Sequence, residues 1–192
     1  MSEVFIREEA GLHLDRANML LAGLSSYGGN GSPVFHAVSS AMKRAGESAR
    51  SKAGKYASEQ YVLSQAGFKA HIRDKVFIEG GAGGVTGIRL VFAGNVIRLI
   101  EFNAKFSRDG GVAVSVRRGG GGTLSHAFFA NTGRTGVYER VGSSRLPIEQ
   151  KFGPSAAHMM MDETVQKNME DQIVKVFNER IEHEITRVLN GW

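Results

Sequence analysis

The chain is 192 residues long, with 42% hydrophobic and 22% charged side chains, a net charge of +5 and no cysteine. This length is enough for one ordinary domain with a buried core, and the near-average composition excludes wholesale disorder. The lack of cysteine excludes disulfide frameworks, thiolate zinc sites and cysteine nucleophiles. No apolar run approaches the roughly 18 residues of a membrane span, and the N-terminus shows no signal-peptide pattern. We therefore expect a protein of a cytoplasm-like compartment, without membrane contact.

The charges are unevenly distributed along the chain. Residues 162–190 carry seven acidic and four basic side chains, a net charge of −3, so the rest of the chain carries +8. A basic body with an acidic arm has two specific interpretations: the body lies near nucleic acid, or the arm of one copy docks on the body of another. A solvated helix on a mildly basic domain is the simpler alternative.

Residues 1–72 are expected to be mainly helical, with a strong start signal where a capping serine precedes Pro33 at the first helical position. The expected elements are a helix over 15–24, a loop over 26–31, a helix from Pro33 to about Tyr61 and a short helix over 64–72. The buried stripe of the long helix is rich in alanine, which favours close packing. It comprises Val34, Val38, Met42, Ala45, Ala49, Ala53 and either Tyr56 or Ala57.

Residues 73–152 change to the alternating pattern of strands. Six short strands are predicted, at 75–79, 87–92, 96–100, 112–117, 127–131 and 136–140. Glycine-rich turns separate them, and no strand–helix–strand alternation occurs, which disfavours a doubly wound parallel sheet. We expect a central antiparallel sheet with long glycine-rich loops, or a curled, barrel-like version of it.

Residues 153–191 are expected to form a long C-terminal helix. It should open at Gly153-Pro154-Ser155, begin firmly at Asp162-Glu163 and end at Gly191. At about 28 residues it is long for a globular helix, so part of it should reach beyond its own domain. The predicted fold is therefore a single α+β domain over 1–192, with N-terminal helices, the sheet core and this helix.

The motifs of common enzymes and metal sites are incomplete in this sequence. The glycine-rich stretch 80–87 lacks phosphate-loop spacing and precedes a strand. His183-Glu184 could begin a zinc-protease motif, but Arg187 occupies the place of the second histidine. We therefore expect no catalytic, cofactor or metal site, no small-molecule substrate and no enzymatic activity.

A basic loop that could contact phosphate backbones non-specifically comprises Lys105, Arg108, Arg117 and Arg118, with four glycines after Arg118. The sequence shows neither the aromatic interleaving of a single-strand binder nor a recognition helix.

Residues 136–191 contain the most distinctive pattern. An aromatic-containing strand leads to a compact run of apolar, proline and glycine positions, and a long helix follows with His183, Glu184 and Ile185 near its end. The run comprises Arg145, Leu146, Pro147, Ile148, Phe152, Gly153, Pro154 and Ser155. This combination resembles the minor tail protein Z family of tailed phages and prophages. The upstream order of helices, strands and a basic glycine-rich turn agrees, so the resemblance covers residues 10–191.

The resemblance implies a virion protein that is made in the bacterial host cytoplasm and completes the head-proximal end of the tail, where it supports head–tail joining. It implies a ring of identical subunits, sixfold to match the tail tube, other tail or neck proteins as partners, and no catalytic residues. DNA in the channel would pass near the basic loop. A contact repeated around a ring fits an acidic helix that meets a basic body on its neighbour.

Two further expectations concern the connector and the function. Pro147 and Pro154 should stiffen an extended connector, which Leu146, Ile148 and Phe152 pin to the sheet. The alternative function is a basic nucleic-acid-binding accessory protein that uses Arg117-Arg118 and the helix at residues 43–55.

Overall fold

The computed structural model describes residues 2–6, 33–81 and 84–191, so the expected helix at 15–24 and the loop at 26–31 lie outside the described residues. The chain divides into two compact units, which are described separately. Unit 1 comprises Met1–Ala53, Asp74–Phe92 and Gln166–Trp192, and unit 2 comprises Gly54–Arg73 and Ala93–Val165. The prediction of a single domain stays a prediction.

The helices follow the sequence signals closely. Helix α2 spans Pro33–Gln60 and α3 spans Gln65–Ala70. The hydroxyl of Ser64 caps α3 by accepting a hydrogen bond from the Gly67 amide. The C-terminal helical region is interrupted: α4 covers Ala156–Met159, and α5 follows over Glu163–Leu189. Asp162 caps α5 by accepting from the Thr164 and Val165 amides at 3.0 and 3.3 Å.

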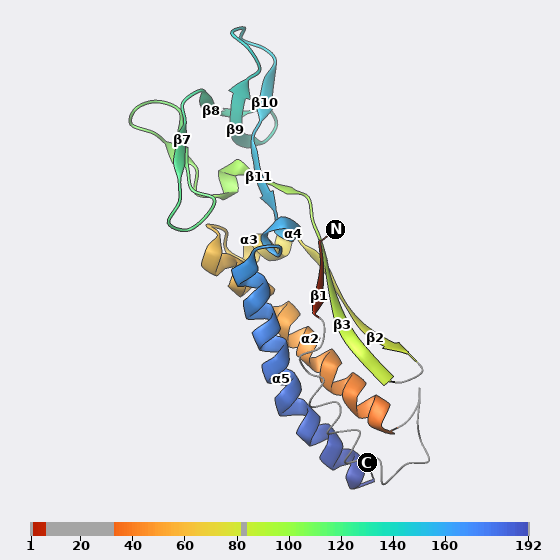
Figure 1. The fold of residues 1–192 in the computed structure, drawn as a ribbon. Coiled ribbons are helices and arrows are strands. Elements are labelled where there is room, and N and C mark those ends of the chain that lie inside the picture. The colour runs from red at the N-terminus through yellow and green to blue at the C-terminus, as the bar shows by residue number, and fades with distance from the viewer. Residues whose placement is uncertain (1, 7–32, 82–83, 192) are drawn as a thin grey trace. The chain divides into compact units, whose positions relative to one another are not determined.

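Unit 1 combines parts of both long helices with one antiparallel sheet of order β1-β3-β2 (Figure 1). The strands are β1 (Ser2–Ile6), β2 (Arg73–Gly81) and β3 (Gly84–Ala93). The sequence did not indicate β1, which pairs with β3 from Ser2↔Phe92 to Ile6↔Ile88.

The core of unit 1 depends on small residues of α2. Five residues of the predicted stripe are buried in this unit: Val38, Met42, Ala45, Ala49 and Ala53. Helix α5 contributes larger apolar residues: Met169, Ile173, Phe177 and Ile181. Ile88 and Leu90 of β3 alternate inward and are buried. A Cβ at Gly46 would lie 2.7 Å from Val76, so glycine at this position lets the sheet approach the helix.

Unit 2 contains three small antiparallel sheets. The first has the order β10-β9-β8, with β8 Ala127–Asn131, β9 Thr135–Arg140 and β10 Ile148–Gln150. The second pairs β4 (Val96–Arg98) with β11 (Phe152–Ser155). The third has the order β5-β6-β7, with β5 Lys105–Phe106, β6 Val112–Val114 and β7 Gly122–Leu124. A short 3-10 helix spans Leu99–Glu101.

The α+β class is confirmed, but the expectation of one central sheet is wrong. The described strands form four separate sheets, and none of them closes into a barrel. The physical reason is that polar turns cut the strands short. The strand expected over 112–117 ends at Val114, because the chain turns around the Ser115 hydroxyl, which lies within hydrogen-bond distance of the carbonyls of Arg117 and Gly120. The expected strand over 96–100 ends at Arg98.

Candidate functional site

The motif that carries the family resemblance comprises Arg145–Ile148 and Phe152–Ser155, and its first part begins at the exposed end of the β9–β10 hairpin. Arg145, Leu146 and Pro147 are exposed there, and the side chain of Leu146 is 67% accessible. Val141 lies across the hairpin end, is 66% accessible, and its amide donates to the Pro147 carbonyl at 3.1 Å.

The prediction that apolar side chains pin the connector to the sheet is wrong for Leu146 and Phe152. Phe152 is 48% exposed, and only Ile148 is half-buried. The backbone holds the connector instead: β10 pairs with β9, and β11 pairs with β4. Between the two strands, the Lys151 amide donates to the Val137 carbonyl at 2.8 Å, and the Lys151 carbonyl accepts from Leu99 at 3.0 Å. Backbone hydrogen bonds hold the connector whether or not its side chains are buried. The apolar residues of the connector therefore did not indicate burial.

An ion pair also ties the connector to β9. The ammonium of Lys151 lies 2.7 Å from the Glu139 carboxylate and 3.6 Å from that of Glu149. The hydrogen bond and charge of Lys151 lower the pKa of Glu139, and the hydrogen bond to Glu139 raises the pKa of Lys151. Both charged forms are therefore favoured across the neutral range.

The second part of the motif has specific packing roles. A Cβ at Gly153 would lie 2.5 Å from the buried ring of Phe102, so the connector passes this ring only because it has no side chain there. The hydroxyl of Ser155 caps α4 by accepting from the His158 amide at 3.0 Å.

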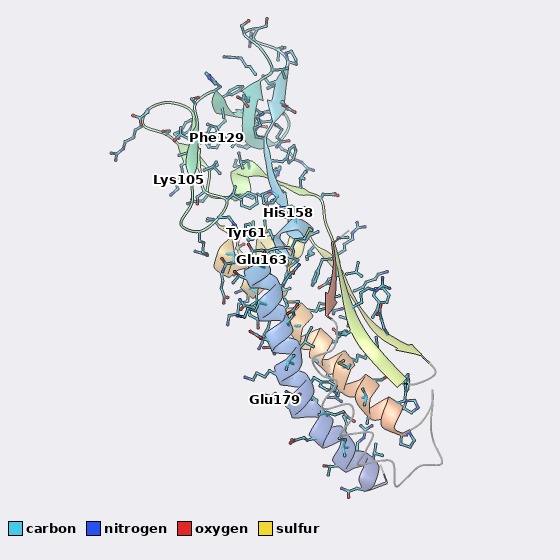
Figure 2. The ribbon with its side chains drawn as sticks, viewed as in Figure 1. Tyr61, Lys105, Phe129, His158, Glu163 and Glu179 are labelled. Carbon is cyan, nitrogen blue, oxygen red and sulfur yellow. The ribbon has the colours of Figure 1, made fainter. Side chains whose placement is uncertain are left out.

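Pro154 and Arg117 line one surface pocket of about 510 Å³, which we call the connector pocket. Its other lining residues are Tyr61, Val116, His158, Met161 and Asp162. Figure 2 marks this region of unit 2 with the labels of Tyr61, His158 and Glu163. The connector pocket therefore brings together a residue of the motif, Pro154, and a residue of the basic loop, Arg117.

Electrostatic contacts organise the connector pocket. The Arg117 guanidinium pairs with the carboxylate of Asp162 and lies 5.4 Å from the centre of the Tyr61 ring. Asp162 is almost buried, whereas 61% of the Arg117 side chain is exposed, so the arginine keeps a surface for a further anionic group. Arg118 has a different role, because its Nε donates to the Ser58 carbonyl at 2.7 Å.

The structure reveals an aromatic pair that sequence reasoning missed. Phe106 of β5 is 80% exposed, and its ring centre lies 4.7 Å from that of Phe129 in an edge-to-face arrangement. Residues 106 and 129 are far apart in sequence. Phe129 lies in an expected strand, whereas Phe106 lies between two expected strands. Only the juxtaposition of their two sheets brings them together, so no signal in the sequence predicts the pair.

Unit 1 contains a polar contact between α2 and α5 that was also missed. Glu184 is only 4% exposed and accepts from the Ser40 hydroxyl at 3.2 Å. Arg44 and Arg187 lie 3.8 and 3.3 Å from its carboxylate. The neighbouring His183 is exposed.

The basic residues of α2, which the alternative function was expected to use, are mostly engaged within unit 1. Arg50 pairs with Glu47 at 3.0 Å, and Lys52 donates to Gln172 at 2.8 Å. Lys43 lines an open groove of about 630 Å³ together with Arg180.

Unit 2 carries the basic excess of the chain. It contains twelve Lys or Arg residues and seven Asp or Glu residues, a net charge of +5, so unit 1 is formally neutral. Eight of those twelve basic side chains form no ion pair with any described residue: Lys69, Arg73, Lys105, Arg108, Arg118, Arg134, Arg140 and Arg145.

Within the described ranges, no three His, Asp or Glu side chains gather as a potential metal site. None of the helices in the described part of the chain has both the length and the apolar character of a membrane span.

Comparison with known proteins gives no match: no protein-family model, curated protein or solved structure matches this chain significantly.

Proposed function

We propose that this chain is a structural virion protein of a tailed phage or prophage, which completes the head-proximal end of the tail and supports head–tail joining. The resemblance of residues 136–191 to the minor tail protein Z family motivates the proposal. The proposed site of action is the virion, with assembly in the bacterial cytoplasm, and no catalytic step, cofactor or small-molecule substrate is assigned.

The observation that carries the proposal is the concentration of exposed apolar side chains on unit 2. Nine large hydrophobic side chains of the described residues are exposed, and seven of them belong to unit 2. These seven are Val96, Phe106, Leu124, Val141, Leu146, Phe152 and Met161. Exposed apolar surface on a water-soluble subunit favours a role in protein–protein contacts. An assembly protein uses such surface in its final complex.

The β9–β10 hairpin end is the proposed subunit contact. It presents Val141 and Leu146 beside Arg145, which forms no ion pair within the described residues. The exposed side of α5 carries acidic residues, including Glu163 and Glu179, which are labelled in Figure 2. We propose that the hairpin end of one copy meets α5 of the next, because a contact between two different surfaces closes a ring when repeated, here of six copies.

The test is the mass of the purified protein, alone and with tail tubes, compared between variants. Val141→Asp/Leu146→Asp places two charges in the proposed contact, and we expect it to abolish a ring that the wild type forms. Phe77→Ser is the matched control, because Phe77 is 40% exposed but belongs to unit 1. Absence of any assembly of the wild type in both settings would overturn the proposal. Equal loss of assembly in the control would reject the hairpin contact.

A second candidate, a nucleic-acid-binding accessory protein, is favoured by the unpaired basic side chains of unit 2. Titration of duplex DNA with the protein at increasing salt separates the two candidates. Tight binding by the monomer with a steep salt dependence would favour the accessory protein. Weak binding by the monomer, together with ring formation, would favour the tail protein.

A further inference from the structure

We propose that the aromatic pair Phe106–Phe129, together with Lys105 and Arg108, is a binding site for single-stranded nucleic acid, in which a base stacks on the ring of Phe106. The site is distinct from the hairpin end and from the connector pocket, and it does not depend on ring assembly.

The geometry leaves the Phe106 ring available. Phe106 belongs to β5, an edge strand of its sheet, and is 80% exposed, the highest exposure among the large hydrophobic residues described. Phe129 lies in the middle of β8 and pairs with Val137 of β9, so the β8–β9 sheet fixes its position. The two ring planes are inclined by 65°, an edge-to-face contact that supports Phe106 from one side. Most of the ring surface remains open to solvent.

The charges around the ring favour a polyanion. Lys105 and Arg108 flank Phe106 in the β5–β6 hairpin, both are exposed, and neither forms an ion pair with a described residue (Figure 2 labels Lys105 and Phe129). Asp109 is the one acidic residue in this hairpin, so the local balance remains positive. Unit 2 as a whole carries +5, which adds a long-range attraction for phosphates.

Single-stranded nucleic acid matches both features at once. It exposes the faces of its bases, which stack on aromatic side chains regardless of sequence, and its phosphates contact nearby lysine and arginine. A duplex hides the base faces, so it can use only the charges. At Phe106, unlike at the hairpin end, a protein partner fits less well, because Lys105 adjoins the ring and the core of a protein interface is depleted of lysine. In the sequence, Phe106 already stands between Lys105 and Arg108, but Phe129, which supports its ring, joins it only through the fold.

The experiment measures fluorescence anisotropy of a labelled 15-nucleotide oligo(dT) with the full chain at low and moderate salt. Stacking on one aromatic residue contributes about 1–3 kcal/mol, so Phe106→Ala should weaken binding by about 5- to 150-fold. Phe106→Tyr should retain the wild-type affinity, because it keeps an aromatic face. Phe152→Ala is the matched control, since Phe152 is another exposed phenylalanine of unit 2, and it should bind like the wild type.

A second readout reports stacking directly. In Phe106→Trp, oligo(dT) should quench the new indole fluorescence, whereas an abasic oligonucleotide of equal length should not. Lys105→Gln/Arg108→Gln should reduce the salt dependence of binding by about one to two phosphate contacts. Wild-type protein that does not bind oligo(dT), or Phe106→Ala that binds as tightly as Phe152→Ala, overturns the proposal. A change in oligomer mass with unchanged oligonucleotide affinity also overturns it, because Phe106 would then be a subunit contact.

Discussion

Replacement of Gly153 by alanine tests whether the connector needs a residue without a side chain. The new Cβ would lie 2.5, 3.0 and 3.1 Å from three carbons of the Phe102 ring. Favourable carbon–carbon contact is about 3.5–4.0 Å, so the nearest pair is about 1 Å too close. Phe102 is fully buried, and its ring therefore cannot swing into solvent. The overlap must be relieved by movement of the packed core or of β11.

The magnitude follows from two opposing effects. Overpacking by one methyl group in a close-packed core costs about 1–3 kcal/mol. The loss of glycine from the unfolded chain stabilises the protein by about 0.4–1 kcal/mol, because alanine has less conformational freedom to lose. We therefore expect the free energy of unfolding to fall by about 0.5–2 kcal/mol. At about 2–4 °C per kcal/mol for a protein of this size, the melting temperature should fall by about 1–8 °C.

The assay is urea denaturation followed by circular dichroism, with Gly142→Ala as the matched control. A Cβ at Gly142 would meet no atom within 4 Å, so this variant should be as stable as the wild type or slightly more stable. Phe102→Leu should lower the free energy of unfolding less in the Gly153→Ala background than in the wild type, since the smaller side chain makes room for the methyl group. Equal stability of Gly153→Ala and Gly142→Ala would refute the packing argument.

Three further changes test contacts described above. Ser40→Ala removes the donor to the buried Glu184 carboxylate, so urea denaturation should show a loss of about 1–3 kcal/mol, and an unchanged midpoint would contradict this role. Asp162→Ala should cost about 1 kcal/mol through loss of the α5 cap, whereas Asp162→Asn should keep the cap, so equal stability of the two variants would argue against capping. Lys151 lowers the pKa of Glu139 below 4.5, so their contact should persist until the pH falls through that lowered pKa. The pKa of Lys151 is raised above 10.5, so its contribution should be lost only as the pH rises through that higher value. Titration by NMR should show the Glu139 pKa return towards 4.5 in Lys151→Met, and an unmoved pKa would reject the assigned cause.

The sequence alone predicted the elements whose signals are local. The proline-led start at Pro33 and the buried alanine stripe define α2, and Asp162 with the apolar repeat defines α5. The short helix expected over 64–72 corresponds to α3, and its cap is local too, because the Ser64 side chain accepts from an amide three residues further on. The α+β class followed from the change of period near residue 73. These signals depend on neighbours along the chain, so no tertiary information was needed to interpret them.

The tertiary structure alone decided how the strands were grouped and which residues meet. Short strands such as β5 and β7 have little pattern of their own and exist because a partner strand supplies their hydrogen bonds. The pairing of Arg117 with Asp162 and the contact of Phe106 with Phe129 join residues far apart in sequence. We expected Leu146 to be buried because it is apolar. The connector is held by backbone hydrogen bonds between β9 and β10 instead, and the Leu146 side chain is exposed. Periodicity along a chain reports which face of an element is apolar, whereas the position of that face in space depends on contacts that only the folded chain makes.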